Sequence, residues 1–409
     1  MRISFAALPS VRREVSRREK VSRLQGLRYA CDMDGNEALI AAIRREIERG
    51  GGRITFARFM ELALYHPQYG YYTGSNVEDH EAARSASAPC QRPDGVDAVG
   101  RAGPARRPRI GTEGDYFTSV SVGPLFGKLL AKQFLKWRDE LGNPPEFEVV
   151  EFGGHRGQLK EDVLATAPDL RYRVIEVADQ LPDSIVGCVF SNEFLDALPV
   201  HHVCVGQGQW QEVYVTVARA SSLRNQPRGK LEACPTILVE TLGPLSTPRL
   251  ADFLAGLPVH LMEGYTTEVN LRALDWLETI ARRLKRGFVL TIDYGYERED
   301  YFSPQHRNGT LLCYHRHTKN DDPYQHIGEQ DITAHVEFTS LIERGKRLGL
   351  EPVLFTDQAH FLLQIGESEI TEIVERTAGQ LSKERQAIHQ LLHPELMGRT
   401  FKVLVQKKS

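Results

Sequence analysis

The stretch Glu151-Phe-Gly-Gly-His-Arg-Gly-Gln-Leu159 decides the fold that the sequence predicts. An apolar run at residues 147–152 leads into its glycines, and a helix-like pattern at residues 158–167 follows them. A buried strand, a glycine-rich turn and a helix in this order are typical of nucleotide-type cofactor sites. Glycine lets the backbone approach the ligand, and the helix N-terminus offers free N–H groups. A second apolar run ends on Glu176, whose carboxylate could accept hydrogen bonds from a ribose. The spacing suits a dinucleotide or an S-adenosylmethionine site.

Length and composition describe an ordinary globular chain. Its 409 residues are 41% hydrophobic and 26% charged, with a formal net charge of −3. This balance creates no global field that would favour nucleic acid or an anionic membrane, and no apolar run reaches the length of a membrane span. Six scattered cysteines without C-x-x-C spacing argue against a zinc site or a disulfide framework and fit a reducing compartment.

Strand-like and helix-like patterns alternate through the second half of the chain. Apolar runs predict strands at residues 147–152, 172–177, 188–190, 288–292, 352–355 and 401–406. Amphipathic patterns predict helices at residues 126–141, 158–167, 271–284 and 338–348. This alternation predicts an α/β fold, with a mostly parallel sheet covered by helices on both faces. Ligands bind at the carboxyl ends of such strands, where Gly153, Glu176, Asn192, Glu193 and Asp293 fall.

The remaining segments divide the chain into four parts. Residues 1–32 form a basic extension that we expect to be disordered, either a mitochondrial presequence or upstream sequence before Met33. Residues 33–74 form a helical segment packed on the core, and residues 75–109, poor in large apolar side chains, form a flexible linker insertion. Residues 110–409 form the catalytic domain. Mitochondrial presequences are poor in acidic residues, so the acidic residues in the extension lead us to expect the protein in the cytoplasm. The mitochondrial matrix is the alternative.

Several blocks, in this order and spacing, resemble the mitochondrial dysfunction protein A family. The blocks are Phe59-Met-Glu-Leu-Ala-Leu-Tyr-His-Pro-Gln-Tyr-Gly-Tyr-Tyr72, Gly114-Asp-Tyr-Phe-Thr-Ser119, Phe126-Gly127, residues 151–159, Ser191-Asn-Glu-Phe-Leu-Asp-Ala-Leu-Pro-Val200, Ile292-Asp-Tyr-Gly295, Gly309-Thr-Leu311 and Asp331-Ile-Thr-Ala-His-Val-Glu-Phe338. The resemblance implies a Rossmann-like class I S-adenosylmethionine-dependent methyltransferase fold with a helical N-terminal segment and family-specific insertions. That family includes a respiratory complex I assembly factor, and its best-understood members symmetrically dimethylate arginine on a complex I subunit. The implied partner is therefore an arginine-containing protein.

Two departures from the family pattern concern the cofactor pocket. His155 replaces the middle glycine of the first motif, and at a positive φ it would cost on the order of 1 kcal/mol. Only fifteen residues separate Glu176 from Asn192, where the family has a longer stretch with another strand and helix. Both changes leave open whether cofactor binding is weakened or lost.

The chemistry of arginine methylation selects the candidate catalytic residues. A guanidinium stays protonated and is a poor nucleophile, so carboxylates that clamp and align it are needed. Glu193 and Asp196 fit that role, and Asn192 could orient the acceptor; the alternative is that the two carboxylates cap a following helix. The predicted cofactor contacts are Asp115, Glu151, Gly153, Gly154, Gly157 and Glu176. His315, His317, Asp331 and His335 lack a compact ligand motif, so we expect no metal among them.

Three functions remain compatible with these residues. The first is a protein-arginine methyltransferase and the second is a methyltransferase acting on a small molecule, because a fold does not fix its substrate. The third is a non-catalytic assembly protein on a degenerate methyltransferase fold, which would have no cofactor affinity.

Overall fold

The computed structural model describes residues 35–74, 119–154, 157–176, 179–219, 236–257, 262–380 and 382–409. The predicted extension at residues 1–32 and the predicted linker at residues 75–109 lie outside these residues, as do Asp115 and His155.

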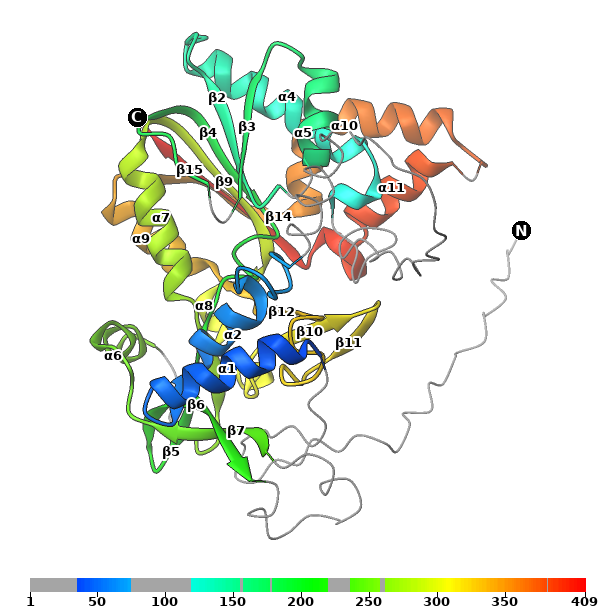
Figure 1. Ribbon diagram of the computed structural model, residues 1–409. Coiled ribbons are helices and arrows are strands. Elements are labelled where there is room, and N and C mark those ends of the chain that lie inside the picture. The colour runs from blue at the N-terminus through cyan, green and yellow to red at the C-terminus, as the bar shows by residue number, and fades with distance from the viewer. Residues whose placement is uncertain are drawn as a thin grey trace, which may run out of the picture.

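The central element is a seven-stranded, mostly parallel sheet (Figure 1). Its strands are β2 (Glu148–Phe152), β3 (Arg171–Ile175), β4 (Ile185–Asn192), β9 (Leu284–Tyr296), β13 (Val336–Glu337), β14 (Glu351–Asp357) and β15 (Phe401–Lys408). They are ordered β3-β2-β4-β9-β15-β14, and the short β13 pairs with the end of β9. Strands β3, β2, β4 and β9 are parallel, whereas β15 runs antiparallel to both β9 and β14.

Alternation along the strands divides the core between the two faces of this sheet. Val149, Cys188 and Phe288 belong to the cluster that includes side chains of α4 (Leu125–Glu140), α5 (Gln158–Thr166), α10 (Gln358–Arg376) and α11 (Lys383–Leu392). Their neighbours Val150 and Val189 belong to the cluster on the other face, under α7 (Leu271–Arg283) and α9 (Phe338–Arg347). Figure 1 shows these two helix groups on opposite sides of the sheet. The predicted α/β class with both faces covered is confirmed.

A second, antiparallel sheet lies at the carboxyl end of the first. It contains β1 (Arg53–Thr55), β5 (His201–Gly206), β6 (Gln209–Arg219), β7 (Thr236–Gly243) and β8 (Thr266–Val269), with α6 (Pro248–Ala255) beside it. The N-terminal segment joins this sheet, because β1 pairs with β6 while α1 (Glu37–Arg49) and α2 (Phe56–Tyr65) bury their apolar faces against it. Figure 1 shows α2 between the two sheets.

A third sheet and several short elements complete the described chain. The sheet contains β10 (Leu312–His315), β11 (Thr318–Asn320) and β12 (Asp331–Thr333), all antiparallel. The short helices are η1 (Val120–Val122), α8 (Arg298–Tyr301), η4 (Pro304–His306) and η5 (Pro394–Gly398). No helix among the described residues is long and apolar enough to cross a membrane.

The shortened segment after Glu176 has a visible consequence. In the described sheet β3 is the outermost strand, and residues 179–184 connect toward β4 without forming a strand or helix. The additional strand and helix that the family pattern places after this carboxylate therefore have no counterpart in the described part of this connection.

Candidate functional site

Strand register brings the predicted site residues to one edge of the central sheet. Phe152 at the end of β2 is paired with Ser191 on β4, and Asn192 is paired with Ile292 on β9. Gly153 follows Phe152, Glu193 follows Asn192, and Asp293 follows Ile292. These three residues therefore lie along the same carboxyl edge of the sheet. Residues predicted from separate sequence blocks thus share one site.

The turn after β2 requires glycine at defined positions. Gly153 has a φ of +69°, and a Cβ there would lie 3.0 Å from the ring of Phe194. A Cβ on Gly154 would lie 2.7 Å from Oε2 of Glu151. Gly157, with a φ of +73° and open space around it, is the N-cap residue of α5. Gly153 and Gly154 therefore leave the start of this turn without side chains, as the approach of a cofactor needs.

Glu151 supports this turn from below. Its side chain is buried, and its Oε2 accepts a hydrogen bond of 3.0 Å from the hydroxyl of Tyr172 on the neighbouring strand. Burial raises the pKa of Glu151 to about 7, against the opposing effect of that hydrogen bond. The carboxyl group is thus held against Gly154.

The first cavity, here called the cofactor-side cavity, has a volume of about 300 Å³. Phe152, Ile175, Phe194 and Leu198 give it largely apolar walls, and Tyr65 from α2 covers it. Glu176 lines it from the exposed end of β3, where its backbone N–H donates a 2.9 Å hydrogen bond to Oδ2 of Asp179. Apolar walls for a ring, a carboxylate for ribose hydroxyls and the thin glycine turn fit S-adenosylmethionine. The residues that would hold it are Glu176 and the backbone at Gly153 and Gly154.

Glu193 occupies a strained position directly after β4. Its φ is +51°, which is uncommon for a residue with a Cβ and is typically kept where it serves function. Oε1 accepts hydrogen bonds from the backbone N–H of Ser119 at 3.0 Å and from Nδ2 of Asn192 at 2.9 Å. Burial, more than any neighbouring charge, raises the pKa of Glu193 to about 8.

Asn192 and Glu193 each keep one oxygen atom that no described residue contacts by a hydrogen bond. Oε2 of Glu193 and Oδ1 of Asn192 are buried and have no hydrogen-bond partner among the described residues. Leaving such atoms without a donor costs roughly 1–3 kcal/mol each. Once Glu193 is ionised, both atoms can accept hydrogen bonds from a bound molecule.

Asp293 has a different task, because its carboxylate organises the loop after β4. Oδ2 accepts the backbone N–H groups of residues 194, 195 and 196 at 2.9–3.4 Å, and Oδ1 accepts that of Tyr294 at 2.8 Å. Burial nevertheless raises its pKa to about 7. Asp293 thus fixes the backbone that presents Glu193 and Asp196.

Asp196 and Asp331 bring further carboxyl groups to the same place. Both are buried, and burial, followed by repulsion from Asp293, Asp331 and Glu193, raises the pKa of Asp196 well above its usual range. Oδ1 of Asp331 accepts a 2.8 Å hydrogen bond from the hydroxyl of Tyr72. The alternative that Glu193 and Asp196 cap a following helix is wrong, because the chain runs from β4 through a turn into β5.

The second cavity, here called the acceptor-side cavity, has a volume of about 430 Å³. Asp196 and Asp331 contribute its acidic groups, and its aromatic walls come from Tyr294, Tyr296, Tyr314 and His335. The two cavities meet the loop after β4 from opposite sides, since Phe194 and Leu198 line the first and Asp196 lines the second.

His335 adds an uncharged wall to the acceptor-side cavity. Its ring lies 6.0 Å from that of Tyr294 and nearly parallel to it. Burial lowers the pKa of His335 to about 4, so the imidazole is neutral near pH 7. The neutral ring adds no positive charge that would repel a cation entering this cavity.

Sequence reasoning found part of this site and missed the rest. The structure brings Asn192, Glu193 and Asp196 together with the glycine turn, and it places Glu151 and Glu176 on the cofactor side. Tyr72 and Tyr314 were missed. The tyrosine-rich block at residues 69–72 was the available signal, but nothing local connects it to Asp331. Of the four residues among which no metal was expected, His317, Asp331 and His335 line the acceptor-side cavity.

Comparison with protein families gives an independent result. Residues 171–356 match the family described as "Putative S-adenosyl-L-methionine-dependent methyltransferase". The matched region runs from β3 to β14 and so includes Glu176, Asn192, Glu193, Asp196 and Asp293.

Individual relatives cover almost the whole chain. A Drosophila melanogaster protein named "Protein arginine methyltransferase NDUFAF7 homolog, mitochondrial" is 25% identical, over 90% of this chain and 85% of the relative. The human protein arginine methyltransferase NDUFAF7, mitochondrial, is 24% identical, over 86% and 79% respectively. A crystal structure from Burkholderia thailandensis with bound S-adenosyl-homocysteine superposes with a TM-score of 0.74 at 28% identity, covering 91% of this chain and 92% of that one.

Proposed function

Since this chain belongs to the family of S-adenosylmethionine-dependent methyltransferases, we propose that it methylates an arginine side chain of a protein substrate. Asn192, Glu193 and Asp196 are the proposed catalytic residues. A respiratory-complex subunit is the substrate that the family resemblance implies, and the names of the relatives favour the mitochondrial matrix over the cytoplasm.

The observation that carries this proposal is the set of buried carboxyl groups beside unused acceptor atoms. Oε2 of Glu193 and Oδ1 of Asn192 have no donor among the described residues, and Asp196 lines the adjoining cavity. A guanidinium group offers five N–H donors in a planar fork that matches a carboxylate. Arginine is therefore the side chain whose donors best fit this set.

Charge supports the same acceptor. Burial comes first among the causes that raise the pKa values of Glu193 and Asp196, and repulsion from Asp293 and Asp331 adds to it in both; a bound cation would reduce both effects. A guanidinium between the two groups favours their ionised forms and so lowers both pKa values. A neutral acceptor would leave the repulsion in place.

The residues of the site have separate roles in the proposed reaction. The bound cofactor supplies a methyl group carried on a positively charged sulfur. Glu193 and Asp196 clamp the guanidinium and align one nitrogen, which must reach roughly 3–3.5 Å from the reacting carbon. Asp293 holds the loop in place. The guanidinium must lose a proton as it gains a methyl group, and Glu193, with a pKa of about 8 before the substrate binds, is the acceptor within the site.

The test uses proteins from cells of the source organism that lack the gene. Purified full-length protein, methyl-labelled cofactor and this extract are incubated, and the labelled proteins are hydrolysed and analysed by mass spectrometry. We expect methylarginine with the wild-type protein and none with Glu193→Gln. Label on another amino acid, or only in molecules too small to be proteins, would contradict the proposal.

A small-molecule acceptor is the second candidate, because of the acceptor-side cavity. Its volume of about 430 Å³ falls within the range of roughly 300–1,000 Å³ that small-ligand sites occupy. The same experiment separates the two, since it follows label into both protein and small-molecule fractions.

A further inference from the structure

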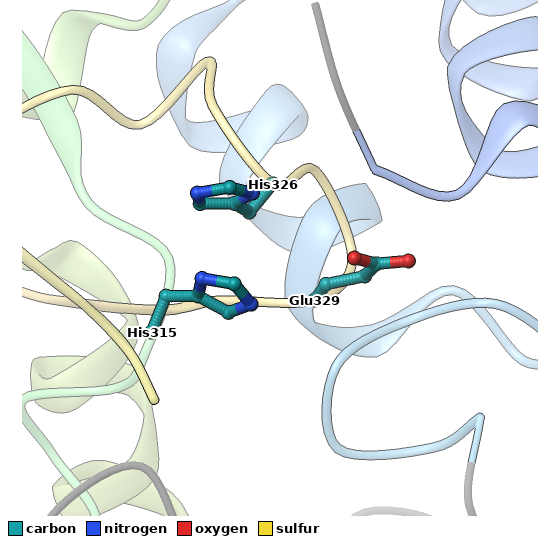
Figure 2. Close-up of side chains that lie close together, drawn as sticks. All are labelled: His315, His326 and Glu329. Carbon is teal, nitrogen blue, oxygen red and sulfur yellow. The ribbon is translucent and has the colours of Figure 1, made fainter. Parts of the chain in front are cut away.

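Two histidines and a glutamate meet on the third sheet, away from the acceptor-side cavity. His315 ends β10, and His326 and Glu329 lie in the loop between β11 and β12. One ligand atom from each of the three side chains lies within 4.8 Å of the others. Figure 2 shows the ring of His326 above that of His315, with the Glu329 carboxylate beside them.

His315 is held by a tight hairpin. It pairs with Thr318 on β11, and the two residues between them, Arg316 and His317, have φ values of +48° and +61°. Positive φ at both central positions is the pattern of a two-residue hairpin turn. Leu312 and Tyr314 of the same strand line the acceptor-side cavity, so alternation directs His315 to the opposite face.

The loop carrying the other two side chains is equally well fixed. The carbonyl of His326 accepts the N–H groups of Glu329 at 2.7 Å and Gln330 at 3.0 Å, which places residues 326 and 329 in one turn. Next to them the carbonyl of Ile327 accepts the N–H of Asn36 at 2.9 Å. The loop is thus anchored to the N-terminal segment.

His326 is also strained in this loop. Its φ of +45° costs on the order of 1 kcal/mol for a residue with a Cβ. Its ring stacks on that of His315, with the ring centroids 3.8 Å apart.

We propose that His315, His326 and Glu329 form a binding site for a divalent transition metal such as Zn²⁺, with water completing the coordination. Two imidazoles and a carboxylate are ligands that Zn²⁺ accepts. Metal–ligand distances of about 2.0–2.2 Å place neighbouring ligand atoms roughly 3.3 Å apart. Glu329 is exposed and the histidines are half-buried, so side-chain rotation closes the remaining gap.

Such a metal would clamp the hairpin to the following loop. Tyr314 and Lys319 lie on this hairpin and line the acceptor-side cavity, so the clamp would stiffen one wall of that cavity. The sequence gives no sign of the site, since His315 and His326 are eleven positions apart and no compact motif joins them.

The test is Zn²⁺ binding by the full-length protein after chelator treatment and dialysis. We expect calorimetry with ZnCl₂ to show one site per chain, and Co²⁺ in its place to give the visible absorption of a tetrahedral complex. His326→Ala and Glu329→Gln should each weaken binding by at least about tenfold. The matched control is the double variant His389→Ala/His393→Ala, which removes another close pair of histidine rings, 4.7 Å apart on and just after α11.

The outcomes separate a built site from chance binding. Unchanged affinity in Glu329→Gln and His326→Ala would overturn the proposal, as would wild-type protein that binds no Zn²⁺. Loss of binding in the control alone would place the metal at α11 and would equally overturn it. Because Glu329 is exposed, its variant decides the question even where His326→Ala fails to fold.

Discussion

The two cavities on either side of the loop after β4 differ in chemistry although one short segment lines both. The cofactor-side cavity has largely apolar walls, and the charged side chains that line it are Glu61, Glu176, Asp179 and Arg272. The acceptor-side cavity has buried carboxyl groups among aromatic rings. Glu193 and Asn192 lie directly before this segment. This contrast is what we expect if the chain binds a large, partly apolar cofactor in one cavity and, as proposed, a cationic acceptor in the other.

The largest effect should come from a substitution that blocks cofactor binding at the cofactor-side cavity. Gly153→Arg adds a side chain at a φ of +69°, next to the ring of Phe194. We expect calorimetry to show S-adenosylmethionine binding weakened by more than about 100-fold, because strain and bulk both act on the turn. Gly264→Arg is the matched control, since Gly264 has a φ of +75° with open space around it. Equal loss of cofactor affinity in both variants would point to general destabilisation of the fold. The two cavities could then not be distinguished by this substitution.

Glu193→Gln should act on the reaction and spare cofactor binding. We expect the turnover rate to fall on the order of 100-fold, since the amide can neither clamp the guanidinium as an anion nor accept its proton. Cofactor affinity should stay within about threefold of wild type. A variant that lost cofactor binding and turnover together would show that the two cavities are not separate in function.

The same variant should gain thermal stability at alkaline pH. The pKa of Glu193 rises from about 4.5 in the unfolded chain to about 8 in the folded one, so its ionisation destabilises the fold as pH rises across that window. The melting temperatures of wild type and Glu193→Gln should therefore be similar near pH 5. They should diverge in favour of the variant toward pH 8. A constant difference across this range would argue against a buried, protonated Glu193.

Glu176→Gln should have an intermediate effect confined to the cofactor side. Replacing the carboxylate weakens hydrogen bonds that it would accept from ribose hydroxyls, and we expect about a tenfold loss of cofactor affinity. Glu351→Gln serves as control, because Glu351 is exposed on the opposite edge strand of the same sheet. If the turnover rate at saturating cofactor also fell, Glu176 would act on both sides.

The smallest effect tests the link between the N-terminal segment and the acceptor side. Tyr72→Phe removes the 2.8 Å hydrogen bond to Asp331, worth about 1 kcal/mol, and should raise KM for the acceptor roughly fivefold. Tyr69→Phe is the control, since the Tyr69 ring stacks on His66 and the substitution keeps that contact. An unchanged KM for the acceptor in Tyr72→Phe would show that the N-terminal segment has only a structural role.

The central sheet was predictable from sequence, and the second sheet was not. The inner parallel strands β2 and β4 are buried on both faces and therefore read as apolar runs, as residues 147–152 do, whereas the outermost strand β3 alternates between exposed and buried residues. The antiparallel strands β5 to β8 carry only short apolar runs, and although β5 and β6 form a hairpin, the pairing of β5 with β8 and of β6 with β1 joins segments far apart in the chain. The kink in α10 at Gly366, where Leu129 of α4 packs, interrupts the helical pattern.

Contacts between distant residues limited the prediction of the site in the same way. Glu193 could be predicted because it directly follows a buried strand. The Tyr72 contact with Asp331 joins two segments that only the folded chain brings together, so neither segment alone indicates it. His155 and Asp115 lie outside the described residues, and their predicted roles stay predictions.

The position of β15 has a consequence for how this protein is made. This strand is the last in the described chain, yet it lies inside the sheet, between β9 and β14. While the ribosome is still adding residues before Phe401, β9 and β14 have no partner between them and present open backbone edges that can pair with other chains. The sheet can close only after Lys408 has been synthesised, so the nascent chain passes through an aggregation-prone stage that a chaperone would shield.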